Sequence, residues 1–299
     1  MSRRTAVFLA LLGALHMAPR AGAYSGGIYN SAGCSCHQPA TSTNVQVTTA
    51  VPSRFVPGAS HDVGVTVRCA PSQDPAKPAC PPAAMTLHQG GFNLTAPAGT
   101  FLSGSNYAVS NPTSGSPHAN HNAKGSFGRS WTVGWQGPND CATKSVTFTT
   151  LANAVDGSSS PRGDAWNFDT RPASSRTVLR APATPGTKPA ITLTNPRPSG
   201  IYNGDSRIES PGPTVVSGSV TLTALASDDS GIQSVTFTDT SVAGTATTLG
   251  GTRSPEDGRV FTAVLTTTLQ VPGPHTITAT AKDCQGLTST TSLDVIMIP

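Results

Sequence analysis

Short runs in which apolar and polar residues alternate are the feature that most constrains the fold of this chain. They occur at residues 45–49, 63–67, 131–135 and 145–149. Period-2 alternation of this kind is typical of a strand with one buried face. In the third run, Trp131 and Trp135 fall on the same face. No window carries the 3.6-residue apolar stripe of a helix over three turns, so the sequence predicts an all-β protein.

The composition agrees with short strands joined by many turns. Charged residues make up 11% of the chain, against about 25% in a typical soluble domain. The chain contains 30 Gly and 26 Pro, and both residue types favour turns over the interior of a helix.

The first 23 residues have the order of a secretory signal peptide. Arg3 and Arg4 form a basic start, residues 6–15 are apolar, and residues 21–23 read Ala-Gly-Ala. The apolar run is too short to span a bilayer, which takes about 20 residues, and no membrane span is expected. The sequence predicts a mature chain that begins near Tyr24 and is secreted or held at the cell surface.

The mature chain is close to neutral. Removal of residues 1–23 takes away three arginines and leaves 16 basic and 15 acidic residues, with no cluster of Lys or Arg. Such a charge gives no electrostatic reason to bind nucleic acid or an anionic membrane. The expected partner is an unknown surface or extracellular molecule.

A proline-rich stretch at residues 181–189 is typical of an interdomain linker. It separates residues 24–180 from residues 190–299, and each part has the length of one β-sandwich. The predicted architecture is two β-sandwiches in tandem.

The second part resembles a bacterial Ig-like domain. The matching pieces are residues 217–222, 226–232, 235–237, 273–279 and 281–286. The resemblance implies a sandwich that serves as a spacer or adhesive module, and it makes His275 a structural strand residue. Asp228, Asp229 and Asp283 can be read as Ca²⁺ ligands or as residues that cap turns. Cys284 departs from the family pattern, which has no cysteine there.

The first part resembles the Reeler-like secreted sandwich called the choice-of-anchor V domain. The matching pieces are residues 25–27, 33–37, 55–58, 91–96, 99–101, 131–135 and 146–148, together with His121. The resemblance implies a sandwich fold and a surface location, and little about function.

Cys34, Cys36 and His37 form a dense cluster near the predicted mature N-terminus. The cluster is one residue shorter than the C-x-x-C-H motif that attaches haem c. A haem bound there would take His37 and His121 as its axial pair, with His118 as the alternative to His121. A zinc site made with one more histidine, and disulfides that tether the N-terminal segment, are the other interpretations. The sequence does not choose between them.

The remaining cysteines suggest disulfides. Cys69 and Cys80 border a proline-rich loop, and a bond between them is predicted. Cys141 and Cys284 then join Cys34 and Cys36 as cysteines without an assigned partner, because six cysteines permit 15 pairings.

No catalytic motif occurs. The sequence lacks G-x-S-x-G, H-E-x-x-H and a glycine-rich phosphate loop before a helix, and no enzyme activity or metal site is expected. The function predicted is that of a non-catalytic binding or structural protein of tandem sandwiches. The alternative is an extracellular electron-transfer protein with a single haem c, and a hydrolase built on a sandwich is the third class.

Overall fold

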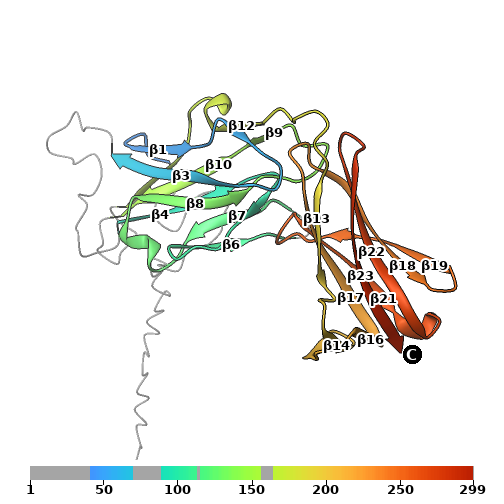
Figure 1. Ribbon diagram of the computed structural model, residues 1–299. Helices are drawn as coiled ribbons and strands as arrows, with labels where there is room; N and C mark the ends of the chain where they lie inside the picture. The colour runs from blue at the N-terminus through green and yellow to red at the C-terminus, as the bar shows by residue number, and fades with distance from the viewer. Residues whose placement is uncertain (1–40, 70–88, 113–114, 156–163, 299) are drawn as a thin grey trace, which may run out of the picture.

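A computed structural model describes residues 41–69, 89–112, 115–155 and 164–298, and every structural statement below concerns these residues. They form two β-sandwiches in tandem, which confirms the predicted fold class (Figure 1). Three 3₁₀ turns are the helical elements: η1 (Gly125–Phe127), η2 (Ala173–Arg176) and η3 (Thr267–Leu269). None of the described helices is long and apolar enough to cross a membrane.

The first sandwich contains three sheets. One has the order β1 (Val45–Ala50), β3 (Ser60–Cys69), β8 (Ser130–Gln136) and β5 (Thr100–Phe101). The second has the order β11 (Ala165–Phe168), β10 (Thr149–Ala154), β4 (Gly90–Thr95), β7 (His118–His121) and β6 (Tyr107–Ser110). A small third sheet joins β2 (Arg54–Phe55), β12 (Thr177–Arg180) and β9 (Ser145–Thr147).

The second sandwich contains two sheets. The smaller has the order β13 (Ala190–Asn195), β17 (Ser219–Ser227), β21 (Val260–Thr266) and β20 (Thr252–Arg253). The larger has the order β15 (Ser206–Glu209), β14 (Gly200–Asn203), β16 (Thr214–Ser217), β23 (Thr288–Ile298), β22 (Gly273–Asp283), β18 (Ile232–Ser241) and β19 (Ala246–Gly250).

The strand prediction is confirmed in each of the four runs. Residues 45–49 lie in β1, 63–67 in β3 and 131–135 in β8, while residues 145–149 divide between β9 and the start of β10. Burial alternates along β1 and β3 as the pattern of side chains predicts.

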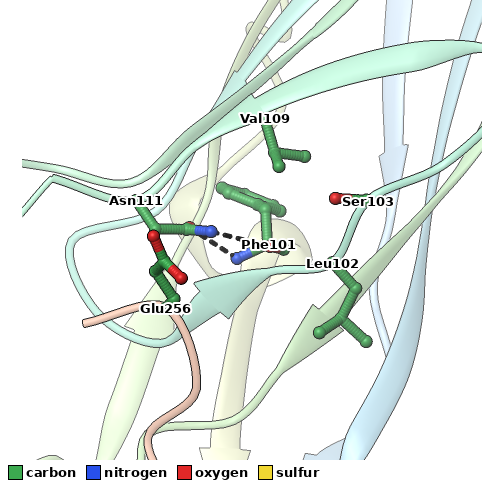
Figure 2. A pocket seen from close by; sticks show the side chains of 6 residues that line it. All are labelled: Phe101, Leu102, Ser103, Val109, Asn111 and Glu256. Carbon is green, nitrogen blue, oxygen red and sulfur yellow. Dashed lines mark hydrogen bonds between the residues drawn. The ribbon is translucent and has the colours of Figure 1, made fainter. Parts of the chain in front are cut away.

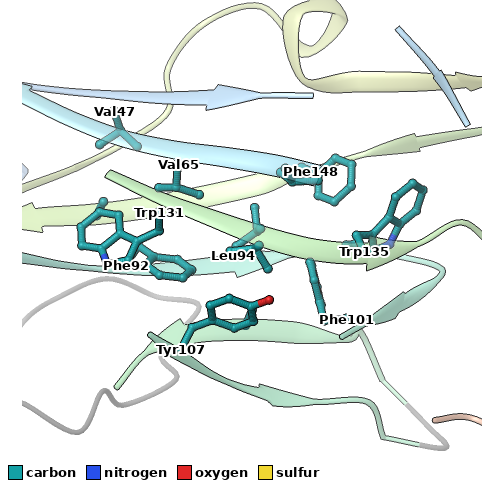
Figure 3. Packing of buried hydrophobic residues seen from close by; sticks show 14 of the residues in the cluster. Val47, Val65, Phe92, Leu94, Phe101, Tyr107, Trp131, Trp135 and Phe148 are labelled. Carbon is teal, nitrogen blue, oxygen red and sulfur yellow. The ribbon is translucent and has the colours of Figure 1, made fainter. Parts of the chain in front are cut away.

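Each sandwich has its own apolar core. In the first, Trp131 and Trp135 are 5% and 0% exposed, and both face inward as predicted (Figure 3). The ring of Trp135 packs edge-on against Phe55 and Phe148, with centroid distances of 5.7 and 5.1 Å. The core of the second sandwich is built from smaller side chains than the first. It includes Phe237 and Ile277, both fully buried.

Candidate functional site

Of the residues predicted to hold a haem, the structure describes His121 and its alternative, His118. Cys34, Cys36 and His37 lie outside the described residues. The expected closeness of His37 to His121 therefore stays a prediction. His118 and His121 both lie in β7. They are three positions apart, and an odd spacing places two side chains on opposite faces of a regular strand. A ligand on one face of this sheet can therefore be contacted by only one of the two histidines.

The ring of His121 is held against the backbone of β4. Its Nδ1 lies 3.1 Å from the backbone nitrogen and 3.4 Å from the carbonyl oxygen of Phe92. An unprotonated Nδ1 accepts from the Phe92 N–H, and a protonated Nδ1 donates to the Phe92 carbonyl. Metal-binding histidines use the second arrangement, in which the nitrogen away from the metal donates. The contacts with Phe92 fit both tautomers.

Gly91 makes room for this ring. A Cβ at Gly91 would meet three atoms of the His121 imidazole at 2.3–2.7 Å. Glycine is required here by close approach, since no side chain fits between the β4 backbone and the ring.

Replacement of Gly91 by Ala is therefore expected to lower the free energy of unfolding by about 1–3 kcal/mol, the usual cost of overpacking. Gly250→Ala is the matched control, because that strand glycine has no heavy atom within 4 Å of the added Cβ. Urea denaturation of both variants measures the difference. Equal stability of the two variants would contradict the packing of His121 over Gly91.

Cys69 ends β3 and is disulfide-bonded. Nη1 of Arg129 lies 3.4 Å from its sulfur. Cys80 lies outside the described residues, so the Cys69–Cys80 pairing stays a prediction.

A disulfide joins the two sandwiches. Cys141, in the loop after β8, bonds Cys284, in the turn after β22, across a sequence separation of 143 residues. Neither cysteine had a partner assigned from the sequence. The signal that could have paired them was the position of Cys284 in a turn where the family pattern has none.

The segment that carries Cys141 is buried between the sandwiches. Gln136 ends β8, and it and the loop residues 137–139 that follow are all buried. Asn139 is 2% exposed, and its side-chain amide donates to the Ala226 and Gly258 carbonyls at 3.0 and 3.3 Å. The Gly258 N–H donates to Oε1 of Gln136 at 3.1 Å. Buried polar side chains that bond across two sandwiches fix their relative orientation.

Arg253 holds the same junction from the second sandwich. Its guanidinium donates to the carbonyls of Asn139, Gly258 and Ile232, the last at 2.8 Å. The guanidinium also lies over the ring of Phe261, 4.7 Å from its centroid. Burial lowers the pKa of Arg253 from its ordinary value.

Asp140 shapes the turn that presents Cys141. Its Oδ1 accepts from the N–H groups of Ala142 and Thr143, both at 2.7 Å. Burial alone would raise the pKa of Asp140, but these hydrogen bonds and the charge of Arg180 lower it below its ordinary value. The carboxylate is thus charged at neutral pH and serves the fold.

The linker is bonded to the second sandwich. The Thr184 N–H donates to Oδ2 of Asp229 at 2.8 Å, and the Gly186 N–H donates to Oε1 of Gln285 at 3.2 Å. The proline-rich stretch is therefore fixed at two points.

Of the three aspartates that were open to a Ca²⁺ interpretation, Asp228 and Asp283 cap turns, while Asp229 accepts from the Thr184 N–H of the linker. Oδ1 of Asp228 accepts from the Ser230 N–H at 2.8 Å. Oδ1 of Asp283 accepts from the N–H groups of Gln285 and Leu287, both at 2.8 Å. Among the described residues, no group of three His, Cys, Asp or Glu side chains could hold a metal ion.

Two hollows lie where the sandwiches meet. One, of about 430 Å³, is lined by Phe101, Leu102, Ser103, Val109, Asn111 and, from the second sandwich, Glu256 (Figure 2). The side-chain amide of Asn111 makes two hydrogen bonds with the backbone of Phe101. Its Oδ1 accepts from the Phe101 N–H and its Nδ2 donates to the Phe101 carbonyl, each at 2.8 Å. The other, of about 260 Å³, is lined largely by Pro and Gly.

No family model matches the chain, and no curated protein matches it. Solved structures with similar folds include an endo-β-1,4-mannanase from Thermotoga petrophila (14% identity, TM-score 0.28), the dimeric latent PorU from Porphyromonas gingivalis (13%, 0.37) and the adhesin InvE from Yersinia pseudotuberculosis (14%, 0.23). They cover 38%, 85% and 85% of this chain. The chain spans only 20%, 24% and 59% of those proteins. Likeness at this level carries no conclusion about function.

Proposed function

We propose that this chain is a secreted or cell-surface, non-catalytic structural or binding protein, in which two β-sandwiches form one rigid unit. The observation that carries the proposal is the junction, where the Cys141–Cys284 disulfide adjoins the buried side chains of Asn139 and Arg253. Disulfides persist in oxidising compartments, which agrees with the signal peptide expected at residues 1–23. A rigid pair of sandwiches suits a spacer that holds a binding surface at a fixed distance and angle.

The finer assignments belong to the same proposal. Residues 24–180 and 190–299 are proposed as the two units, connected by residues 181–189. The choice-of-anchor V and bacterial Ig-like resemblances of the sequence support a surface role for both. The partner is proposed to be an extracellular or surface molecule.

Fractionation of the native host tests the location. The protein is expected in the medium or on the cell surface, accessible to protease on intact cells, with an N-terminus near Tyr24. Recovery from the cytoplasm with Met1 intact would overturn the proposal.

The haem alternative has its own decisive measurement. Under the proposed non-catalytic role, protein purified from the native host should show no Soret band. A Soret band that survives acid–acetone extraction would establish a covalently attached haem and replace the non-catalytic structural role with electron transfer.

A further inference from the structure

A buried aspartate near the end of β18 and a buried histidine near the start of β22 lie at the ends of these strands opposite the junction, where Ile232 bonds Asn139 and Cys284 bonds Cys141. His275 in β22 and Asp239 in β18 have side chains 2% and 1% exposed. Nδ1 of His275 lies 2.9 and 3.1 Å from the two carboxylate oxygens of Asp239. Its Nε2 lies 2.5 Å from the carbonyl oxygen of Val271. The sequence analysis made His275 a structural strand residue, and its burial and bonds agree.

Both ring nitrogens therefore face acceptors. A neutral imidazole has one N–H and can donate to only one of them. Both hydrogen bonds form only when the pair holds two protons, one on Nε2 and one between Nδ1 and the carboxylate. Burial raises the pKa of Asp239, and this effect is larger than the lowering caused by His275. A proton therefore stays available within the pair.

The carbonyl of Val271 belongs to the tip segment, defined here as residues 267–272, which includes η3 and leads into β22. Leu269 and Val271 expose 81% and 53% of their surface there. Apart from His275, the segment is held by the Thr267 N–H on the Gly218 carbonyl at 2.9 Å and by the Gln270 side chain, which accepts from the Thr247 hydroxyl at 3.3 Å. The bond from Nε2 holds the segment at Val271, in its C-terminal half.

We propose that the His275–Asp239 pair is a proton-dependent latch that fixes the tip segment in acid and frees it as the pH rises. Loss of one proton to solvent leaves a single N–H on the ring. That proton stays on Nδ1, because a hydrogen bond to a carboxylate is stronger than one to a neutral carbonyl. Nε2 then presents a lone pair to the lone pairs of the Val271 carbonyl, and the two repel.

Few other charges influence the latch. Asp239 is the only charged residue of β18, and Asp294 is the only one of β23. The tip segment and the turn at residues 242–245 carry none. Asp294 is exposed and accepts a hydrogen bond from the Thr276 hydroxyl at 2.7 Å. Because burial raises the pKa of Asp239, the folded chain holds the proton of this carboxyl more tightly than the unfolded chain does, and this contribution to stability is expected to be lost as the pH rises.

Asp239→Asn separates the latch from ordinary packing. An amide can donate to Nδ1, so a neutral His275 keeps its proton on Nε2 and satisfies both partners at every pH. Asp294→Asn is the matched control, because it removes an acid from the neighbouring strand without touching His275.

Hydrogen exchange of the peptide that spans residues 267–274 in the mature protein provides the measurement, corrected for the intrinsic pH dependence of exchange. Wild type and Asp294→Asn should lose about 10-fold to 100-fold in protection as the pH rises, the worth of a hydrogen bond to a charged group. Asp239→Asn should keep its protection. Constant protection in wild type, or the same loss in Asp239→Asn, would overturn the latch.

If Asp239→Asn does not fold, ¹⁵N NMR of wild-type His275 decides. Two protonated ring nitrogens in acid, followed by loss of the Nε2 proton, are expected. A ring that keeps its Nε2 proton and loses the one on Nδ1 would contradict the proposal.

Discussion

Replacing both Cys141 and Cys284 by serine is expected to lower the free energy of unfolding by about 3–5 kcal/mol. In the chain-entropy model the gain from a disulfide grows with the loop it closes, and these cysteines are 143 residues apart. Denaturant titration of wild type and the double variant measures the loss. Ala142→Ser, an exposed change beside Cys141, is the control and should leave the stability unchanged.

The same disulfide determines how the protein responds to proteolysis. Cleavage in residues 181–189 of the wild-type protein should yield pieces that stay joined until a reductant is added. In the double serine variant they should separate without reductant. Separation of the wild-type pieces under non-reducing conditions would show that Cys141 and Cys284 are not bonded to each other.

Arg253→Met is expected to cost about 2–4 kcal/mol. Methionine keeps much of the apolar stem over Phe261 but removes the donors to the carbonyls of Asn139, Gly258 and Ile232. A buried acceptor left without its partner costs about 1–3 kcal/mol, and some of these carbonyls keep another donor. The loss should appear in thermal and urea unfolding and in a wider distribution of interdomain distances by solution scattering.

Arg259→Met is the matched control for Arg253→Met. Arg259 is 44% exposed in its side chain, and its guanidinium pairs with Asp257 at 2.8 Å. An exposed pair of this kind contributes at most about 1 kcal/mol. Similar losses in the two variants would show that Arg253 has no special role at the junction.

Several local features were predictable because neighbouring residues decide them. The inward placement of Trp131 and Trp135 follows from alternation along one strand. The turn-capping roles of Asp228 and Asp283 follow from hydrogen bonds to groups within a few residues. For His275, the sequence indicated a structural role but not Asp239 as its partner, because that contact joins strands 36 residues apart.

The candidate haem site shows the limit of motif reading. His121 was singled out by its position in a family pattern, and the pattern says nothing about what surrounds its ring. Only the fold shows that Nδ1 lies against the backbone of Phe92 in β4, near both its N–H and its carbonyl.

By itself, the sequence determined that this protein is all-β, with two sandwiches in tandem, because strand periodicity and turn residues act over a few positions. Only the tertiary structure decided how the sandwiches meet. The junction depends on Asn139 and the Cys141–Cys284 pair, which lie in loops, and on Arg253 of the short strand β20. No local pattern marks such residues, since their burial and their partners exist only once both sandwiches are folded and docked.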